Sequence, residues 1–378
     1  MSNLDSAITS ARIALSENDA KKALKLLKPF KKSLKDENSS NIVLKQLFAE
    51  SYLENGQVEK AYPMLVECCE LDPKGSTAGC DKFFSLGQII GGQDGLRILQ
   101  QGIENLSTVS EMTEEHTAKI VSGLLTMIEI WMTDLCMEPN AEAECEQLIT
   151  NAMQISNETS PETWATLGSI RISQQRFGDA SAAFTQAWKY FELRKNQAGH
   201  DTLDNNTAAN EEFADMLQPL ISLAKMCMEV GLYDVALKVE QAIKEIDEDN
   251  LEGYYLEGFT NYLICKIELF KQQNSDIQLT PENIYEFNQH IQELPLQLDN
   301  ELIAEPLHES RVSLSFALRF GDNVDPNDEI AAEILTGTKA LLEEIGGPVS
   351  DQELEQIRKG PQTDGVVLEE EDILEFSD

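Results

Sequence analysis

The amino-acid sequence predicts an all-α protein, a right-handed solenoid of stacked helix pairs. Small and large apolar residues recur at fixed spacings through most of the chain, with a period of about 34 residues. Hydrophobic residues make up 42% of the 378 residues, which is enough to build a core. A single helix pair cannot bury its own apolar face, so we expect successive pairs to stack on one another. No apolar run approaches the ~18 residues of a membrane span, so we expect no membrane partner.

The clearest repeat runs from Ser160 to Trp188. Counted from Pro161 as position 1, it has Trp164 at 4, Leu167 at 7, Gly168 at 8, Ala180 at 20, Phe184 at 24 and Ala187 at 27. This spacing resembles the tetratricopeptide repeat. Small residues at positions 8 and 20 let the two helices approach closely, and the large residues fill the remaining space between them. We therefore predict a helix, a turn and a second helix in this segment.

Five further segments show parts of the same pattern, each with a small residue at position 20. They are residues 4–35, 42–73, 80–102, 118–155 and 217–248, with Ala23, Ala61, Gly95, Ala143 and Ala236 at that position. The wider spacing before the last of them coincides with a polar stretch, so we expect a loop insertion at residues 195–212. The repeats are divergent, and we expect the solenoid to span residues 1–270.

The C-terminal part of the chain departs from the repeat pattern. Thr280-Pro281 and Glu305-Pro306 are typical of helix starts, so residues 271–345 are expected to form capping helices at the end of the stack. Residues 346–378 begin with Gly-Gly-Pro and end in a run of acidic residues. We predict an acidic, disordered tail there.

The charge of the chain narrows its possible partners. Asp and Glu total 67 against 29 Lys and Arg, which gives a formal net charge of −38. Nucleic-acid binding requires clustered Lys and Arg, so direct contact with nucleic acid is not expected. An acidic surface instead attracts basic partners, with fast association that weakens as salt is added. The charge therefore favours a basic protein partner.

The sequence contains no recognisable catalytic motif. It lacks a phosphate-binding loop, a nucleophile elbow and a zinc-protease motif, and its 4 histidines are scattered without a partner at ligand spacing. The 7 cysteines form no CxxC pair and lie in apolar helical patterns, so we interpret them as buried core residues. We therefore expect no enzyme activity, no cofactor and no metal.

The remaining candidate for a functional site is the surface of the predicted helix pairs. In tetratricopeptide repeats the first helix of each pair lines a concave groove, and the residues predicted to face it here are mostly acidic. They are Glu50, Glu54, Asp81, Phe84, Glu129, Glu162, Glu229, Glu252 and Tyr255, with Lys225 as the only basic residue in this register. One interpretation is a solvated helix face. The other is a groove for an extended basic segment, with carboxylates forming charge pairs and the two aromatic rings as anchors.

One segment is more specific than the general repeat pattern. Residues 129–146, EIWMTDLCMEPNAEAECE, resemble a signature of fungal chaperones dedicated to ribosomal protein four of the large subunit, and residues 252–259 resemble a later helix of that family. Within this signature we interpret Trp131, Leu135 and Cys136 as core residues rather than as ligand contacts.

The resemblance implies a function. Members of that family bind the newly made ribosomal protein through its long basic internal loop, keep it soluble and escort it to the nuclear pre-ribosome. It implies a monomer in a one-to-one complex, located in the cytoplasm and the nucleus. The first residues lack a basic stretch followed by an apolar one, so we expect no secretory leader. The alternative is a general tetratricopeptide-repeat scaffold that holds the subunits of a larger assembly.

Overall fold

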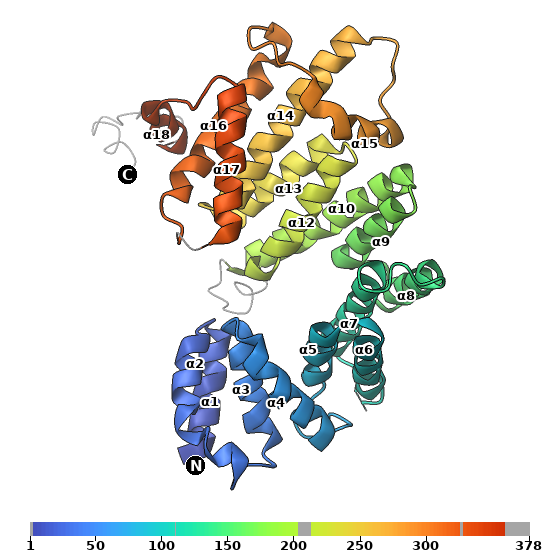
Figure 1. Ribbon diagram of the computed structural model, residues 1–378, viewed down its shortest axis with the longest axis vertical. Helices are drawn as coiled ribbons and strands as arrows, with labels where there is room; N and C mark the ends of the chain where they lie inside the picture. The colour runs from blue at the N-terminus through green and yellow to red at the C-terminus, as the bar shows by residue number, and fades with distance from the viewer. Residues whose placement is uncertain (1–2, 110, 203–212, 326–327, 360–378) are drawn as a thin grey trace, which may run out of the picture. The chain divides into compact units, whose positions relative to one another are not determined.

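The computed structural model describes residues 3–109, 111–202, 213–325 and 328–359, and all regular structure among them is helical (Figure 1). The prediction of an all-α solenoid is confirmed. The chain divides into two compact units, residues 1–170 and residues 171–378. The division falls inside helix α9 and therefore within the stretch 1–270, which the sequence predicts to be one solenoid.

The first unit is built from antiparallel helix pairs that follow one another along the chain. Its helices are α1 (Asn3–Ser16), α2 (Ala20–Leu27), α3 (Ile42–Glu54), α4 (Val58–Leu71), α5 (Asp81–Ile90), α6 (Gly92–Ser107), α7 (Glu114–Met132), α8 (Ala141–Ile155) and the start of α9 (Pro161–Ser173). Two short 3-10 helices, η1 (Lys28–Phe30) and η2 (Ser33–Lys35), connect α2 to α3. The pairs α1–α2, α3–α4, α5–α6 and α7–α8 each pack together, as the repeat pattern predicts.

The close approach of the paired helices depends on their small residues. In α5 and α6, a Cβ added to Gly87 would lie 2.6 Å from Cγ of Leu99 and 3.0 Å from the carbonyl oxygen of Gly95. At the corresponding positions of α3 and α4, Ala49 and Ala61 are both 0% exposed. The steric interpretation of positions 8 and 20 therefore holds for both pairs.

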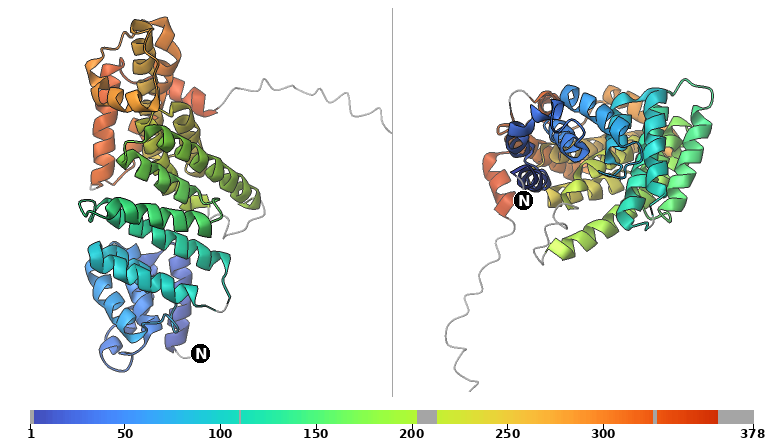
Figure 2. Two further views of the ribbon diagram at one scale, coloured as in Figure 1. Left: turned by 90° about the vertical axis from the view of Figure 1, so that its right-hand side faces the viewer. Right: turned by 90° about the horizontal axis from the view of Figure 1, so that it is seen from below.

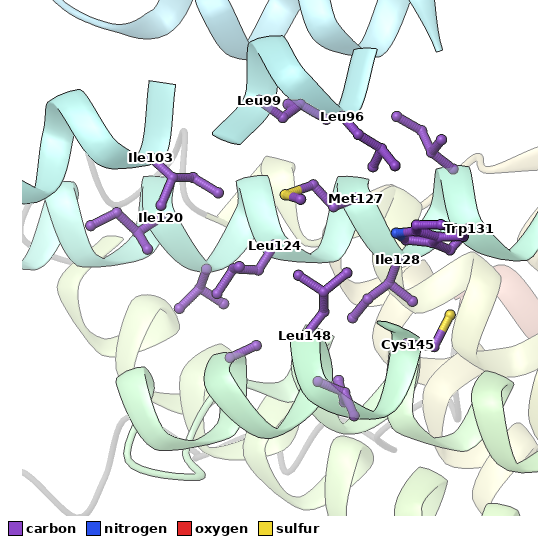
Figure 3. Packing of buried hydrophobic residues seen from close by; sticks show 14 of the residues in the cluster. Leu96, Leu99, Ile103, Ile120, Leu124, Met127, Ile128, Trp131, Cys145 and Leu148 are labelled. Carbon is purple, nitrogen blue, oxygen red and sulfur yellow. The ribbon is translucent and has the colours of Figure 1, made fainter. Parts of the chain in front are cut away.

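A second set of apolar residues joins α5 to α9 within the first unit. Trp131 is 5% exposed and lies beside Ile128 and above Cys145 in the packed layer between α7 and α8 (Figure 3). Leu135 packs against the same cluster, so the core interpretation of these two signature residues is correct. For Cys136 it is wrong, because α7 ends at Met132 and the following turn leaves this thiol exposed.

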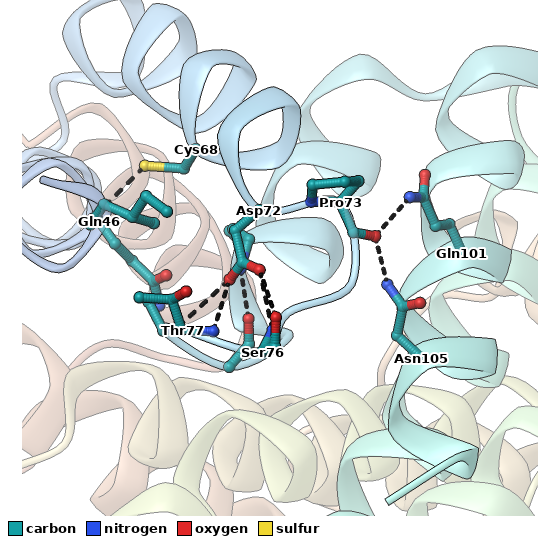
Figure 4. Close-up of polar contacts among 12 residues, drawn as sticks. Gln46, Cys68, Asp72, Pro73, Ser76, Thr77, Gln101 and Asn105 are labelled. Carbon is teal, nitrogen blue, oxygen red and sulfur yellow. Dashed lines mark hydrogen bonds and ion pairs between the residues drawn. The ribbon is translucent and has the colours of Figure 1, made fainter. Parts of the chain in front are cut away.

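The turn between α4 and α5 is held by a buried ion pair and by polar contacts of Asp72 with Ser76 and Thr77, which Figure 4 shows. Asp72 is 4% exposed and Lys82 is 1% exposed, and the Lys82 ammonium lies 3.0 Å from Oδ2 of Asp72. The Asp72 carboxylate also accepts hydrogen bonds from the backbone amides of Ser76, Thr77 and Ala78. Burial opposes ionisation, but the Lys82 hydrogen bond and these amides outweigh it and lower the pKa of Asp72 to about 2.

The second unit contains two further layers of helices. They are α10 (Phe177–Thr202), α12 (Leu217–Glu229), α13 (Tyr233–Ile246), α14 (Leu251–Gln273), α15 (Pro281–His290), α16 (Ala304–Gly321), α17 (Glu329–Glu344) and α18 (Asp351–Lys359), with short 3-10 helices η3 (Ile291–Glu293) and η4 (Glu301–Ile303). Helices α12 and α13 form the pair predicted at residues 217–248.

The predicted capping helices pack along the sides of the repeat helices. Helix α16 lies along α14, as Figures 1 and 2 show from different directions. The Ser310 hydroxyl donates to the Gly258 carbonyl at 2.7 Å, and a Cβ on Gly258 would meet Leu314 at 2.5 Å. Helix α15 lies against α10, where Phe177 and Tyr285 stack with ring centroids 4.3 Å apart.

Two segments that the sequence predicts to be irregular are helical. Helix α10 continues to Thr202, where a loop is expected from residue 195, because Ala198 is buried and Lys195 pairs with Glu245. Helix α18 occupies residues 351–359 of the expected tail, since Leu354 is 2% exposed and Arg358 pairs with Asp249 at 2.9 Å. Residues 346–350 of the expected tail have no regular structure, and residues 203–212 and 360–378 of the two segments lie outside the described residues.

Replacing Gly87 with Ala should destabilise the first unit by about 1–3 kcal/mol, because the added methyl group overpacks the contact between α5 and α6. Chemical denaturation monitored by circular dichroism measures the change. Gln88→Ala, at an exposed position of the same helix, is the control and should have little effect. Equal stability of the Gly87→Ala variant and the wild type would contradict the steric account.

Replacing Asp72 with Asn should cost about 3–5 kcal/mol, because it leaves the buried Lys82 ammonium without a counter-charge. The folded state lowers this pKa from 3.8 to about 2, so the contribution is present above pH ~4 and is lost as the pH falls towards 2. Denaturation curves at several pH values test both points.

A double change, Asp72→Leu with Lys82→Met, should cost less than Asp72→Asn. The reverse order would show that the ion pair is not the source of the stability.

Candidate partner-binding surface

The first helices of the pairs in the first unit carry most of the predicted acidic residues. Glu50 and Glu54 lie on α3, Asp81 begins α5, Glu129 lies near the end of α7 and Glu162 lies in the first turn of α9. We call these five residues the acidic surface of the first unit. Each of them lies on the first helix of its own pair, as the repeat pattern predicts.

Glu50 and Asp81 lie close enough to interact electrostatically. The Glu50 side chain is partly buried and accepts a hydrogen bond of 2.9 Å from the Gln46 amide. Its pKa is raised above the usual value, mainly by burial and further by the charge of Asp81. A carboxylate whose proton affinity is raised by a neighbouring negative charge would be stabilised by an incoming cation.

A lysine that the sequence analysis missed lies next to this pair. Lys119 of α7 contacts Asp81 and Glu115, both at 2.9 Å. Its hydrogen bond holds the pKa of Glu115 below the usual value. The spacing of Glu115 and Lys119, four residues apart on one helix, is a sequence signal that could have revealed them. Lys119 thus neutralises part of the acidic surface.

The other acidic residues of this surface are more open. Glu54 and Glu129 are exposed, and neither forms an ion pair with any residue that the structure describes. Glu162 is half-buried, and one of its carboxylate oxygens accepts a hydrogen bond of 2.9 Å from the Ser160 hydroxyl. Glu54 and Glu129 are therefore the carboxylates most available to a partner.

The two predicted aromatic anchors are partly used by the fold itself. The Phe84 ring lies against Gly123 of α7, where an added Cβ would approach it to 2.5 Å. The Tyr255 hydroxyl lies 3.0 Å from the position of a Cβ on Gly337 of α17. Both rings are half-buried, so the structure assigns each a packing role and leaves only part of its surface to a partner.

In the second unit the remaining predicted acidic residues lie on α12 and α14. The Glu252 carboxylate of α14 pairs with Lys225 of α12 at 2.5 Å. Glu229, at the end of α12, is half-buried, and burial raises its pKa. The Asn288 amide of α15 donates to the Glu229 carbonyl at 3.2 Å. The C-terminal helices thus reach part of the surface that the sequence predicts to be open.

The described residues offer little for other kinds of site. Among them, no group of three or more His, Cys, Asp or Glu side chains could hold a metal ion. No helix in the described part of the chain has the length and apolarity needed to cross a membrane.

The chain is similar to known fungal proteins. Residues 249–372 match the family described as the ACL4 C-terminal domain. A protein of Emericella nidulans named probable assembly chaperone of rpl4 is 30% identical over 62% of this chain, and the match spans 58% of that relative's length. A Schizosaccharomyces pombe protein of the same name is 28% identical over 70% of this chain and 75% of its own. The predicted resemblance is confirmed.

A solved structure shares the fold. It is described as assembly chaperone of RpL4 (Acl4), residues 1–338, and matches 72% of this chain and 98% of its own with a TM-score of 0.53 at 23% identity. The family match on residues 249–372 begins at α14, the helix along which α16 packs. The matched stretch thus contains α14 and the C-terminal helices that follow it.

Replacing Lys119 with Met should raise the pKa of Glu115 towards its usual value, because the hydrogen bond that lowers it is removed. An NMR titration of the side-chain carboxyl carbons measures this change. Lys74→Met removes the same charge at an exposed site that has no ion pair with a described residue, and it should leave Glu115 unchanged. An unaltered Glu115 midpoint in Lys119→Met would show that the two side chains do not interact.

Proposed function

Since this chain shares a C-terminal family domain and substantial similarity with fungal proteins named assembly chaperones of rpl4, we propose that it is an assembly chaperone of ribosomal protein four. In this proposal it binds the newly made protein through its long basic internal loop and keeps it soluble. It then accompanies the ribosomal protein from the cytoplasm to the nuclear pre-ribosome. The complex contains one copy of each protein.

The observation that carries the proposal is the set of carboxylates on the first helices of the pairs. Glu54 and Glu129 are exposed and form no ion pair with a described residue, while burial and Asp81 raise the pKa of Glu50. A segment rich in Lys and Arg would relieve the repulsion between these carboxylates. The basic segment would also be kept from binding unrelated RNA, because the carboxylates would pair with the Lys and Arg side chains that otherwise contact phosphates.

The proposed role requires binding, protection and release rather than covalent chemistry. The relatives are named as chaperones, and the sequence lacks catalytic motifs, so we propose that this chain is not an enzyme. Electrostatic binding also allows release, because ribosomal RNA carries a denser negative charge than a protein surface and can compete for the basic loop. The proposal thus links capture and handover to the same set of charges.

Changing both Glu54 and Glu129 to Lys should weaken capture of ribosomal protein four, because two attractive charges become repulsive. We expect the affinity for the ribosomal protein to fall about tenfold at low salt, a change of about 1.4 kcal/mol, and the recovered amount to fall with it. Co-purification at low and high salt provides the measurement, with circular dichroism to verify folding. Both side chains are exposed, so the change should not disturb the core.

The matched control changes Glu59 and Glu70 to Lys, which alters the net charge equally on the exposed side of α4. It should retain the client. Equal loss in both variants would show that only overall charge matters and that the acidic surface is not the site. Several unrelated partners with little salt dependence would instead support a general scaffold.

A further inference from the structure

The first helical repeat carries a cluster of unpaired cations in an otherwise acidic protein. Most basic side chains of the described chain have an acidic or polar partner, but a set of lysines in residues 21–35 does not. Lys21, Lys25, Lys28, Lys32 and Lys35 form no ion pair with any described residue, although acidic residues outnumber basic ones 67 to 29. No described carboxylate forms an ion pair with these ammonium groups, so they are open to an external partner.

Part of this cluster surrounds a pocket of about 600 Å³ between the η1–η2 connection and the pair α3–α4. The pocket is lined by Lys31, Lys32, Leu34, Lys35, Asp36, Lys45, Pro63, Met64 and Glu67. The first three of its lysines are exposed, whereas Lys45 is 5% exposed and pairs with Glu67. Pro63 and Met64 lie in α4 and give the pocket an apolar side opposite the lysines.

The η1–η2 segment is fixed in position by contacts with α3. The Lys31 ammonium donates to the Tyr52 hydroxyl at 2.8 Å and lies 5.3 Å from the centre of the same ring. Leu34 and Phe30 pack against the core of the first two repeats. The lysines on this segment are therefore presented by an ordered backbone rather than by a loose loop, which lowers the entropic cost of binding.

We propose that this pocket binds an acidic segment of a partner protein, in which carboxylates flank one or two apolar side chains. The carboxylates would pair with Lys32 and Lys35, and an apolar side chain would contact Leu34, Pro63 and Met64. We call this site the basic pocket. Its charge is opposite to that of the acidic surface, so a chaperone engaged with a basic client could contact a second partner here.

A peptide fits this pocket better than a nucleic acid. Asp36 and Glu67 lie in its lining and would repel a continuous phosphate backbone, whereas a peptide can place uncharged residues beside them. The aliphatic lining lacks the aromatic faces on which bases usually stack. An acidic peptide can place its carboxylates by the unpaired lysines and its apolar groups by Met64.

The test uses the full chain and a short fluorescein-labelled peptide of glutamates that contains one leucine and one phenylalanine. Fluorescence anisotropy should show saturable binding that weakens as salt is added. Changing Lys32 and Lys35 to Glu should lower the affinity at least about tenfold. Met64→Ser should reduce affinity for this probe but not for an all-glutamate peptide of equal length.

The matched control changes Lys21 and Lys25 to Glu, two exposed and unpaired lysines of α2 outside the pocket. An equal loss of affinity in this control would overturn the proposal, since it would indicate diffuse attraction. Tighter binding of oligouridylate than of the peptide would assign the pocket to RNA instead. An affinity that rises when residues 361–378 are deleted would assign it to the acidic end of this chain. The assay needs no ribosomal protein, so absence of peptide binding would contradict the basic pocket without contradicting the proposed chaperone function.

Discussion

The close approach of two helices within each pair is the constraint on which the other features depend. Where Gly87 faces Gly95 there is no room for a larger side chain, and the paired axes are held near each other. In the pair α3–α4 the small residues Ala49 and Ala61 are fully buried. This approach aligns the first helices of successive pairs, so residues at equivalent positions form a surface. The acidic surface depends on this approach, because its five residues are all carried by first helices of the pairs.

The charged residues of the first unit include a pair in the interior and side chains on the surface that form no ion pair with described residues. Inside the protein, Lys82 and Asp72 neutralise each other and secure a turn. On the surface, Glu54 and Glu129 form no ion pair with described residues, and neither do Lys32 and Lys35 on the connection between α2 and α3. Buried charges thus serve the fold, while unpaired exposed charges of each sign are available for different partners.

The sequence predicts the features that depend on local spacing. It does not predict those helix boundaries and contacts that depend on residues far apart in the chain. The helix pairs and the packing of Trp131 follow from short-range patterns. The extension of α10 depends on Lys195 reaching Glu245, and α18 depends on Arg358 reaching Asp249, so neither helix could be anticipated from its own residues. The packing of Tyr255 against α17 is likewise invisible without the fold, because Gly337 lies far along the chain.

The most direct test of the account is the salt dependence of client binding. Isothermal titration calorimetry of the purified full chain with the basic internal loop of ribosomal protein four should give one-to-one binding. The logarithm of the dissociation constant should rise steadily with the logarithm of the salt concentration, because charge pairs on the acidic surface supply the attraction. Absence of binding at low salt, or an affinity that does not change with salt, would contradict the account.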